Sequence, residues 1–77
     1  GLVKLESLYL SENSIDDISS LAELKGLREL DLSFNQIEDI SVLADLPSLQ
    51  YVNLVDNPVK NIQVMDLLAA RGVIVIY

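Results

Sequence analysis

Residues 27–37 read Leu-Arg-Glu-Leu-Asp-Leu-Ser-Phe-Asn-Gln-Ile, and this spacing of leucine, asparagine and isoleucine decides the fold. The same spacing begins at Leu5 and again, with valine in places, at Leu49, so it recurs every 22 residues. The apolar positions that follow, Ile40 and Leu43, recur at the same interval. Repetition at a fixed period of roughly 20–50 residues predicts a solenoid, in which one short unit is stacked on the next.

The spacing of apolar residues changes halfway along each repeat. Leu30 and Leu32 alternate with polar neighbours, which is the two-residue period of a half-buried strand. After the strand, Ile37, Ile40 and Leu43 are spaced by three, which suits a tight helical turn or a 3₁₀ segment. A single strand and return cannot bury its own apolar side chains. We therefore expect the units to bury these side chains against their counterparts in adjacent coils.

The spacing LxxLxLxxNxI resembles the leucine-rich repeat family, and the resemblance covers the whole chain. The 22-residue length and the segments 17–24 and 39–46 are most similar to bacterial internalin-type repeats. An intracellular class, typified by phosphatase-regulatory subunits, shares the length and much of the pattern. The resemblance implies an α/β leucine-rich repeat solenoid. In that fold a short parallel β-sheet lies on the concave side, helical or 3₁₀ turns lie on the convex side, and the main use is to bind other proteins.

The repeat register divides the chain into one domain with five segments. We expect the tail of a preceding repeat, three repeats and the closing strand of a C-terminal cap, over residues 1–4, 5–26, 27–48, 49–70 and 71–77. The opening segment suggests a fragment of a longer solenoid, whether natural, proteolytic or engineered. If the closing strand keeps the 22-residue register, Ile74 lies beside Val52, and Val73, Val75 and Tyr77 point to the concave side.

Polar residues at fixed places in the repeat have structural explanations. Asn13, Asn35 and Asn57 stand where each strand turns, and an amide side chain can both donate to and accept from backbone groups that the bend leaves unpaired. We expect the three to form a ladder. Asp17 and Asp39 each precede an apolar turn and can cap its N–H groups.

Composition limits the class of partner. The chain has 77 residues, 51% of them hydrophobic, with twelve acidic side chains against five basic ones and a net charge of −7. This charge disfavours nucleic acid, because phosphate binding depends on Lys and Arg, and favours a protein with a basic surface. No apolar run is long enough to cross a membrane, so we expect no membrane insertion.

Catalytic motifs are missing from the sequence. Without His or Cys there is no nucleophilic pair of the usual kinds, and no nucleotide-binding glycine motif is present. We therefore expect no enzyme, no cofactor and no metal. The acidic columns Asp16 with Glu38 and Asp17 with Asp39 leave a hard cation such as Ca²⁺ as an alternative, although turn capping explains them more simply.

The expected concave face carries the candidate binding site. Its strand positions other than Leu, with the residues that follow them, gather all four aromatic side chains of the chain and several carboxylates. Aromatic side chains among polar ones are typical of protein-binding patches. The alternative is that they pack across neighbouring strands and only stabilise the sheet. The candidate residues are Tyr9, Glu12, Glu29, Asp31, Phe34, Tyr51, Asn53, Val75 and Tyr77.

Three classes of function stay open at this point. The first is a protein-recognition module of a longer bacterial protein, at the cell surface or secreted if the internalin-like resemblance applies. The second is a cytoplasmic scaffold or a subunit like the phosphatase regulators. The third is an excised or designed segment without activity of its own. In each case the chain could also self-associate, through the uncovered N-terminal end or the apolar C-terminal edge strand.

Overall fold

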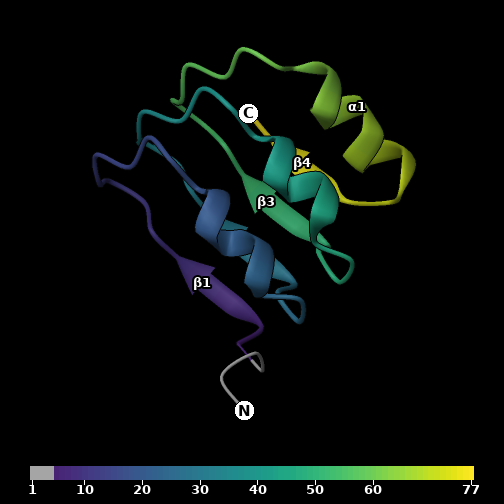
Figure 1. Cartoon of the computed structure of the whole chain (residues 1–77). Coiled ribbons are helices and arrows are strands. Elements are labelled where there is room, and N and C mark those ends of the chain that lie inside the picture. The colour runs from purple at the N-terminus through teal and green to yellow at the C-terminus, as the bar shows by residue number, and fades with distance from the viewer. Residues whose placement is uncertain (1–4) are drawn as a thin grey trace.

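A computed structural model describes residues 5–77 as one stack of strands and helical turns (Figure 1). The strands are β1 (Ser7–Tyr9), β2 (Glu29–Asp31), β3 (Tyr51–Asn53) and β4 (Ile74–Ile76). They are joined by the 3₁₀ helices η2 (Ser19–Glu23) and η3 (Ser41–Asp45) and by the α-helix α1 (Gln63–Ala70). The expected boundary residues 1–4 lie outside the described part of the chain.

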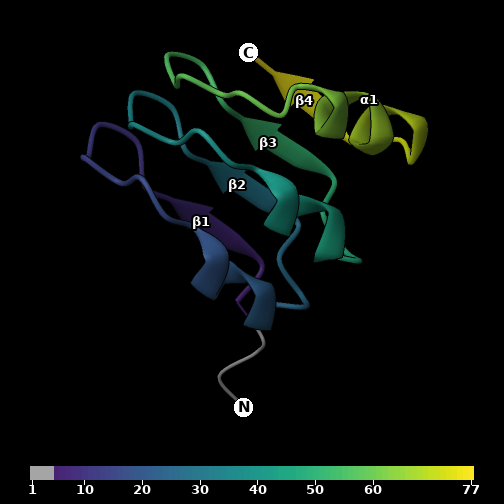
Figure 2. The ribbon, with the colours of Figure 1, turned by 45° about the horizontal axis from the view of Figure 1, so that its top comes forward.

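The four strands form one parallel sheet in the order β1-β2-β3-β4. η2, η3 and α1 all lie on the same side of this sheet, and the other side is left open (Figure 2). Parallel neighbours joined by a return on one face are what the repeat pattern predicts, so the expected α/β solenoid is confirmed. No helix within residues 5–77 has the length and apolar character needed to cross a membrane.

The strand register follows the repeat for the first three strands and then shifts. Leu8 lies opposite Leu30, and Leu30 opposite Val52, a separation of 22 residues in each case. Val52, however, lies opposite Val75 rather than Ile74, so the last separation is 23 residues. The predicted register of the closing strand is therefore wrong by one residue. Because side chains alternate along a strand, the shift exchanges its inward and outward positions.

The core is built from stacked columns of leucine and isoleucine. In the second coil Leu27, Leu30, Leu32, Ile37 and Ile40 have no exposed surface. Each lies between its counterparts in the coils before and after it, which is how a short repeat buries its apolar side chains. Burying one such side chain stabilises the fold by about 1.5–3 kcal/mol, so these columns are the main source of stability.

Apolar side chains of the first coil are less well covered. Leu8, Leu10 and Ile15 are only half-buried against the core, and Leu5 is 42% exposed. Their counterparts in the second coil are fully buried. The apolar side chains of the first coil therefore stabilise the fold less than their counterparts in the second coil.

The expected asparagine ladder is present. The side-chain oxygen of Asn35 accepts hydrogen bonds from the N–H groups of Asn13 and Ile15, each at 3.1 Å. Its NH₂ group donates to the carbonyl of Leu10 in the preceding coil at 3.0 Å and to that of Leu32 in its own coil at 2.9 Å. One coil later, Asn57 accepts from the N–H of Ile37 at 3.0 Å and donates to the carbonyls of Leu32 at 2.8 Å and Leu54 at 3.2 Å. Each amide thus joins two coils at the bend.

Turn capping by aspartate is also confirmed. The N–H group of Ser19 donates to Asp17 Oδ1 at 2.9 Å, and that of Ser41 donates to Asp39 Oδ1 at the same distance. Each bond satisfies a backbone N–H group in the first turn of a 3₁₀ helix. Such a group has no acceptor within the helix itself.

The C-terminal unit replaces the 3₁₀ helix with an α-helix. α1 ends at Ala70, and the chain turns away at Gly72, whose φ of 88° is accessible to glycine without strain. The side chain of Asn61, just before this helix, does not cap it: its oxygen accepts from the N–H of Ile40 in the coil before. Arg71 instead fastens the unit, donating to the carbonyls of Ala44 at 3.0 Å and Leu46 at 2.9 Å.

Candidate functional site

The open side of the sheet carries two rows of side chains, which we call the concave face. Strand register places the members of each row side by side, one from every strand. Neighbouring members are about 4.8 Å apart across the sheet, close enough for their side chains to interact. The first row is Ser7, Glu29, Tyr51 and Ile74, and the second row is Tyr9, Asp31, Asn53 and Ile76.

Glu29 is the centre of a hydrogen-bonded group on this face. The hydroxyl of Ser7 donates to Glu29 Oε1 at 2.9 Å, and the phenol of Tyr9 donates to the same oxygen at 3.2 Å. Tyr9 is 65% exposed, so the group is open to solvent. The structure therefore brings together two of the predicted site residues, Tyr9 and Glu29, through direct contact.

Asp31 and Asn53 stand at the same position of successive repeats and accept the same kind of hydrogen bond. Asp31 Oδ1 accepts from the N–H of Ser33 at 3.0 Å and from its hydroxyl at 2.7 Å. Asn53 Oδ1 accepts from the N–H of Val55 at 3.0 Å. These contacts two residues along the chain fix the bend after each strand. Both side chains are half-buried, so part of each still faces the concave side.

Phe34 and Glu12 lie beyond the strand ends rather than within the two rows. They adopt φ values of 59° and 60°, in the left-handed region that non-glycine residues seldom occupy, and Asp56 does the same in the third repeat with 59°. Phe34 is 50% exposed. It follows Glu29, the register partner of Tyr51, by five residues, so the two aromatic residues stand at opposite ends of the strands.

Two predicted site residues do not belong to the concave face. Val75 lies opposite Val52 and packs against the core, because the register is shifted by one residue. Tyr77 lies one position beyond β4, outside the paired rows, and is exposed past the end of the sheet. The expectation that all four aromatic residues share one face is therefore wrong. Tyr9 and Tyr51 are the aromatic members of the two rows.

Ile74 and Ile76 take the places that Val73 and Val75 were expected to fill. They are 59% and 40% exposed, beside Tyr51 and Asn53 on β3. Sequence reasoning missed them because residues 73–76 are all apolar, so the alternation of apolar and polar residues cannot show which side faces inward. The last unit differs from the others in its longer, α-helical return.

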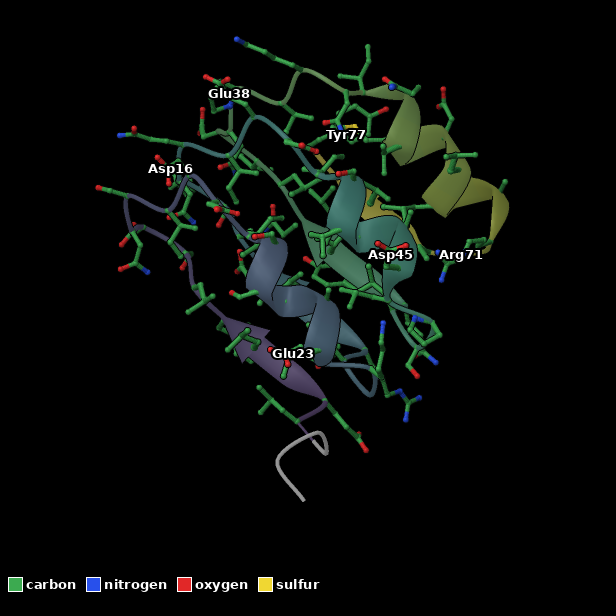
Figure 3. All side chains as sticks on the ribbon, viewed as in Figure 1. Asp16, Glu23, Glu38, Asp45, Arg71 and Tyr77 are labelled. Atoms are coloured by element: carbon green, nitrogen blue, oxygen red, sulfur yellow. The ribbon has the colours of Figure 1, made fainter. Side chains whose placement is uncertain are left out.

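A second acidic cluster lies at the bends and is explained by capping. Asp16, Asp17 and Asp39 border a depression of about 300 Å³, and Figure 3 shows Asp16 and Glu38 on neighbouring loops at this end of the coils. Bonds from the backbone N–H and hydroxyl of Ser19 hold the pKa of Asp17 below its ordinary value of 3.8. Residues 5–77 contain no group of three or more metal-ligating side chains that could hold an ion.

Comparison with known families identifies the repeat. The family model described as Leucine Rich repeats (2 copies) matches residues 3–45 and, one repeat later, residues 25–67. These two matches together span most of the chain. The chain therefore belongs to the leucine-rich repeat family. A search of curated proteins found none that matches it.

Membership in this family defines a general class of function. Leucine-rich repeats are generally protein–protein interaction modules and are typically not enzymes. The partner and the binding surface are particular to each protein, and in this chain they have to be inferred from its own side chains.

Proposed function

We propose that this chain is a protein-recognition module that binds its partner on the concave face. The observation that carries the proposal is the pair of rows on the open side of the sheet, where Tyr9, Tyr51 and two isoleucines stand beside the carboxylates of β2. Aromatic and apolar side chains among polar ones are the usual composition of a protein-binding patch. The opposite side of the sheet is covered by η2, η3 and α1 (Figure 2).

The charge of the face supports a basic partner rather than nucleic acid. Glu6, Glu29 and Asp31 lie on or next to β1 and β2, and Arg28 is the basic side chain among them. Arg28 Nη1 lies 3.9 Å from Glu6 Oε1, so its charge is balanced by that carboxylate. A surface with this excess of negative charge attracts a positively charged protein and repels phosphate groups.

The repeat subtype gives the second part of the proposal. Segments 17–24 and 39–46 contain the 3₁₀ helices η2 and η3, and the first three strands keep the 22-residue register. Both features support an internalin-like repeat in a longer bacterial protein. The 22-residue register equally suits the intracellular class, so a cytoplasmic scaffold is the alternative.

The test begins by selecting ligands without assuming their chemistry. A library of random 12-residue peptides is selected against the 77-residue chain, and each selected peptide is measured against Tyr51→Ala and against Leu67→Ala. Leu67 lies on α1 and is exposed, so it is a matched apolar control. Loss of an anchor usually costs about 2 kcal/mol or more, so Tyr51→Ala should weaken binding by about thirtyfold and Leu67→Ala should not.

The alternative explanation of Tyr51 is that it only supports the sheet. In that case Tyr51→Ala lowers the melting temperature and leaves the affinity for every selected peptide unchanged. Binding that depends on Leu67 and not on Tyr51 would likewise contradict the proposal, since it would place the site on the helical side.

A further inference from the structure

The concave face is divided into an acidic half and an apolar half. On β2 the outward side chains are Glu29 and Asp31, whereas on β4 they are Ile74 and Ile76. Tyr51 lies between the halves, on β3. We infer that the partner presents a Lys or Arg side chain to Glu29 and an apolar side chain to Tyr51 and Ile74. This inference rests on the proposed function and specifies the chemistry of the ligand.

Glu29 is held ready to accept a cation. Ser7 and Tyr9 both donate to its Oε1, so its carboxylate is fixed before any partner arrives, and no described residue donates to Oε2. Among residues 5–77 the ion pairs are Arg28 with Glu6 and Lys60 with Glu38, so Glu29 has no cationic side chain as a partner there. A pre-positioned acceptor loses less conformational entropy on binding than a mobile one.

The surroundings of Glu29 suit a long basic side chain. A depression of about 200 Å³ lies beside it and is lined by Glu6, Ser7, Arg28, Glu29 and Gln50. Asp31, the second carboxylate on β2, also has no basic partner among the described ion pairs. The exposed ring of Tyr9 offers a face to which a Lys or Arg cation is attracted.

The apolar half is contiguous across two strands. Tyr51 and Ile74 are register partners, and Asn53 and Ile76 are partners in the next row. Two exposed isoleucines beside a half-buried tyrosine form a small apolar surface next to the polar side chains of β2. A ligand that covers it gains free energy from burying that apolar area.

The distance between the halves sets a requirement on the partner. Glu29 lies on β2 and Ile74 on β4, two strand spacings apart in the same row, which is about 10 Å. The basic and apolar side chains of the partner must therefore leave the same side of its surface at about this separation. A ligand that is only basic, or only apolar, engages half of the face.

The experiment uses peptides selected against the 77-residue chain that lose affinity for Tyr51→Ala. Their affinities are measured for Glu29→Gln and Ile74→Ser, with Glu23→Gln and Leu67→Ser as matched controls. Figure 3 shows Glu23 on a 3₁₀ helix, on the helical side of the sheet. We expect Glu29→Gln and Ile74→Ser each to weaken binding by about tenfold and the controls to leave it unchanged. Melting temperatures verify that each variant is folded.

Exchanging the two charges distinguishes a direct contact between Glu29 and the peptide from a general electrostatic attraction to the acidic face. Glu29→Lys should abolish binding of a selected peptide, and replacing the basic residue of that peptide by Glu should restore it. If the selected peptides depend on Tyr51 but carry no basic residue, or ignore Glu29→Gln, the inference is wrong while the proposed function stands. If selection yields no peptide that depends on Tyr51, the proposed function is itself overturned.

Discussion

The side chain of Asn35 accepts a hydrogen bond at 3.1 Å from the backbone N–H of Asn13, which stands at the same position of the preceding repeat. Asn35 and Asn57 each satisfy backbone groups at the bend of the preceding coil as well as at their own bend. The buried amide of Asn35 reaches carbonyls in two coils. Asn13, in the first coil, donates to the carbonyls of Leu10 and Ser11 in its own coil and is exposed.

The first prediction compares these two asparagines. Asn35→Ala should lower the free energy of unfolding by about 2–3 kcal/mol, because it leaves buried backbone groups of two coils without partners. Asn13→Ala should cost less than about 1 kcal/mol, since water can replace its contacts. Urea unfolding of both variants measures the difference, and similar midpoints would show that the ladder does not stabilise the stack.

The second prediction concerns the unequal burial of the leucine columns. Leu30→Ala should cost about 2–5 kcal/mol, because Leu30 is fully buried and leaves a cavity between two coils. The equivalent Leu8→Ala should cost less than half as much, since Leu8 is only half-buried in the first coil. Thermal unfolding of the pair tests this, and an equal loss would mean that the first coil is packed as tightly as the second.

The third prediction concerns Arg71, which joins the last unit to η3. Arg71→Ala removes two hydrogen bonds to the carbonyls of Ala44 and Leu46 and should destabilise the chain by about 1–2 kcal/mol. Lys60→Ala is the control, because the exposed ion pair of Lys60 with Glu38 is worth at most about 1 kcal/mol. Urea melts that rank the two variants in the opposite order would contradict this role of Arg71.

The fourth prediction is a pH dependence that comes from the capping aspartates. Hydrogen bonds from Ser41 lower the pKa of Asp39 below its ordinary value of 3.8, and those from Ser19 lower that of Asp17. A carboxyl group whose pKa is lowered by folding stabilises the fold fully above its unfolded value. That contribution is lost as the pH falls through the lower, folded-state pKa.

Replacing both aspartates by asparagine isolates this effect. Asn keeps an oxygen that can accept the same N–H group but does not titrate. The stability of the native chain relative to the Asp17→Asn, Asp39→Asn variant should be constant above pH 5 and should decrease below about pH 3.8. A difference in melting temperature that does not change between pH 5 and pH 2 would exclude the charged caps as the cause.

Much of this fold could be predicted because its determinants are repeated. Leu30 and Leu32 establish the strand by alternation, and Asn35 marks the bend after it. Each of these features occurs several times, so one register explains the strands, the returns and the ladder together. Local pattern and tertiary structure agree because every contact is made with the neighbouring copy of the same pattern.

The end of the sheet could not be predicted in the same way. α1 replaces a 3₁₀ helix and brings one additional residue into the last unit, so Val75 rather than Ile74 lies opposite Val52. Residues 73–76 are all apolar, so both possible registers of β4 place apolar side chains in the core. The sequence therefore does not favour either register. The packing of α1 against the stack, which no local pattern reports, decides which one forms.

The sequence predicts the kinds of side chain on the concave face better than it predicts which residues lie there. Tyr9, Glu29, Asp31, Tyr51 and Asn53 lie together in the two rows as expected. The contact of Tyr9 with Glu29 is diagonal, between adjacent strands and different rows, so it depends on side-chain conformations that the repeat pattern does not specify. Val75 and Tyr77 do not lie in the rows, because the register of β4 differs by one residue from the predicted one.

The fifth prediction, that the concave face binds the partner, is tested most directly by mapping the contact on the molecule. The amide resonances of the isotopically labelled 77-residue chain are recorded by nuclear magnetic resonance during titration with a selected peptide. We predict that the largest shifts fall on β1 to β4, at Glu29, Tyr51 and Ile74 and their row neighbours. Shifts confined to η2, η3 and α1 would contradict the account, because the partner would then bind the helical side of the solenoid.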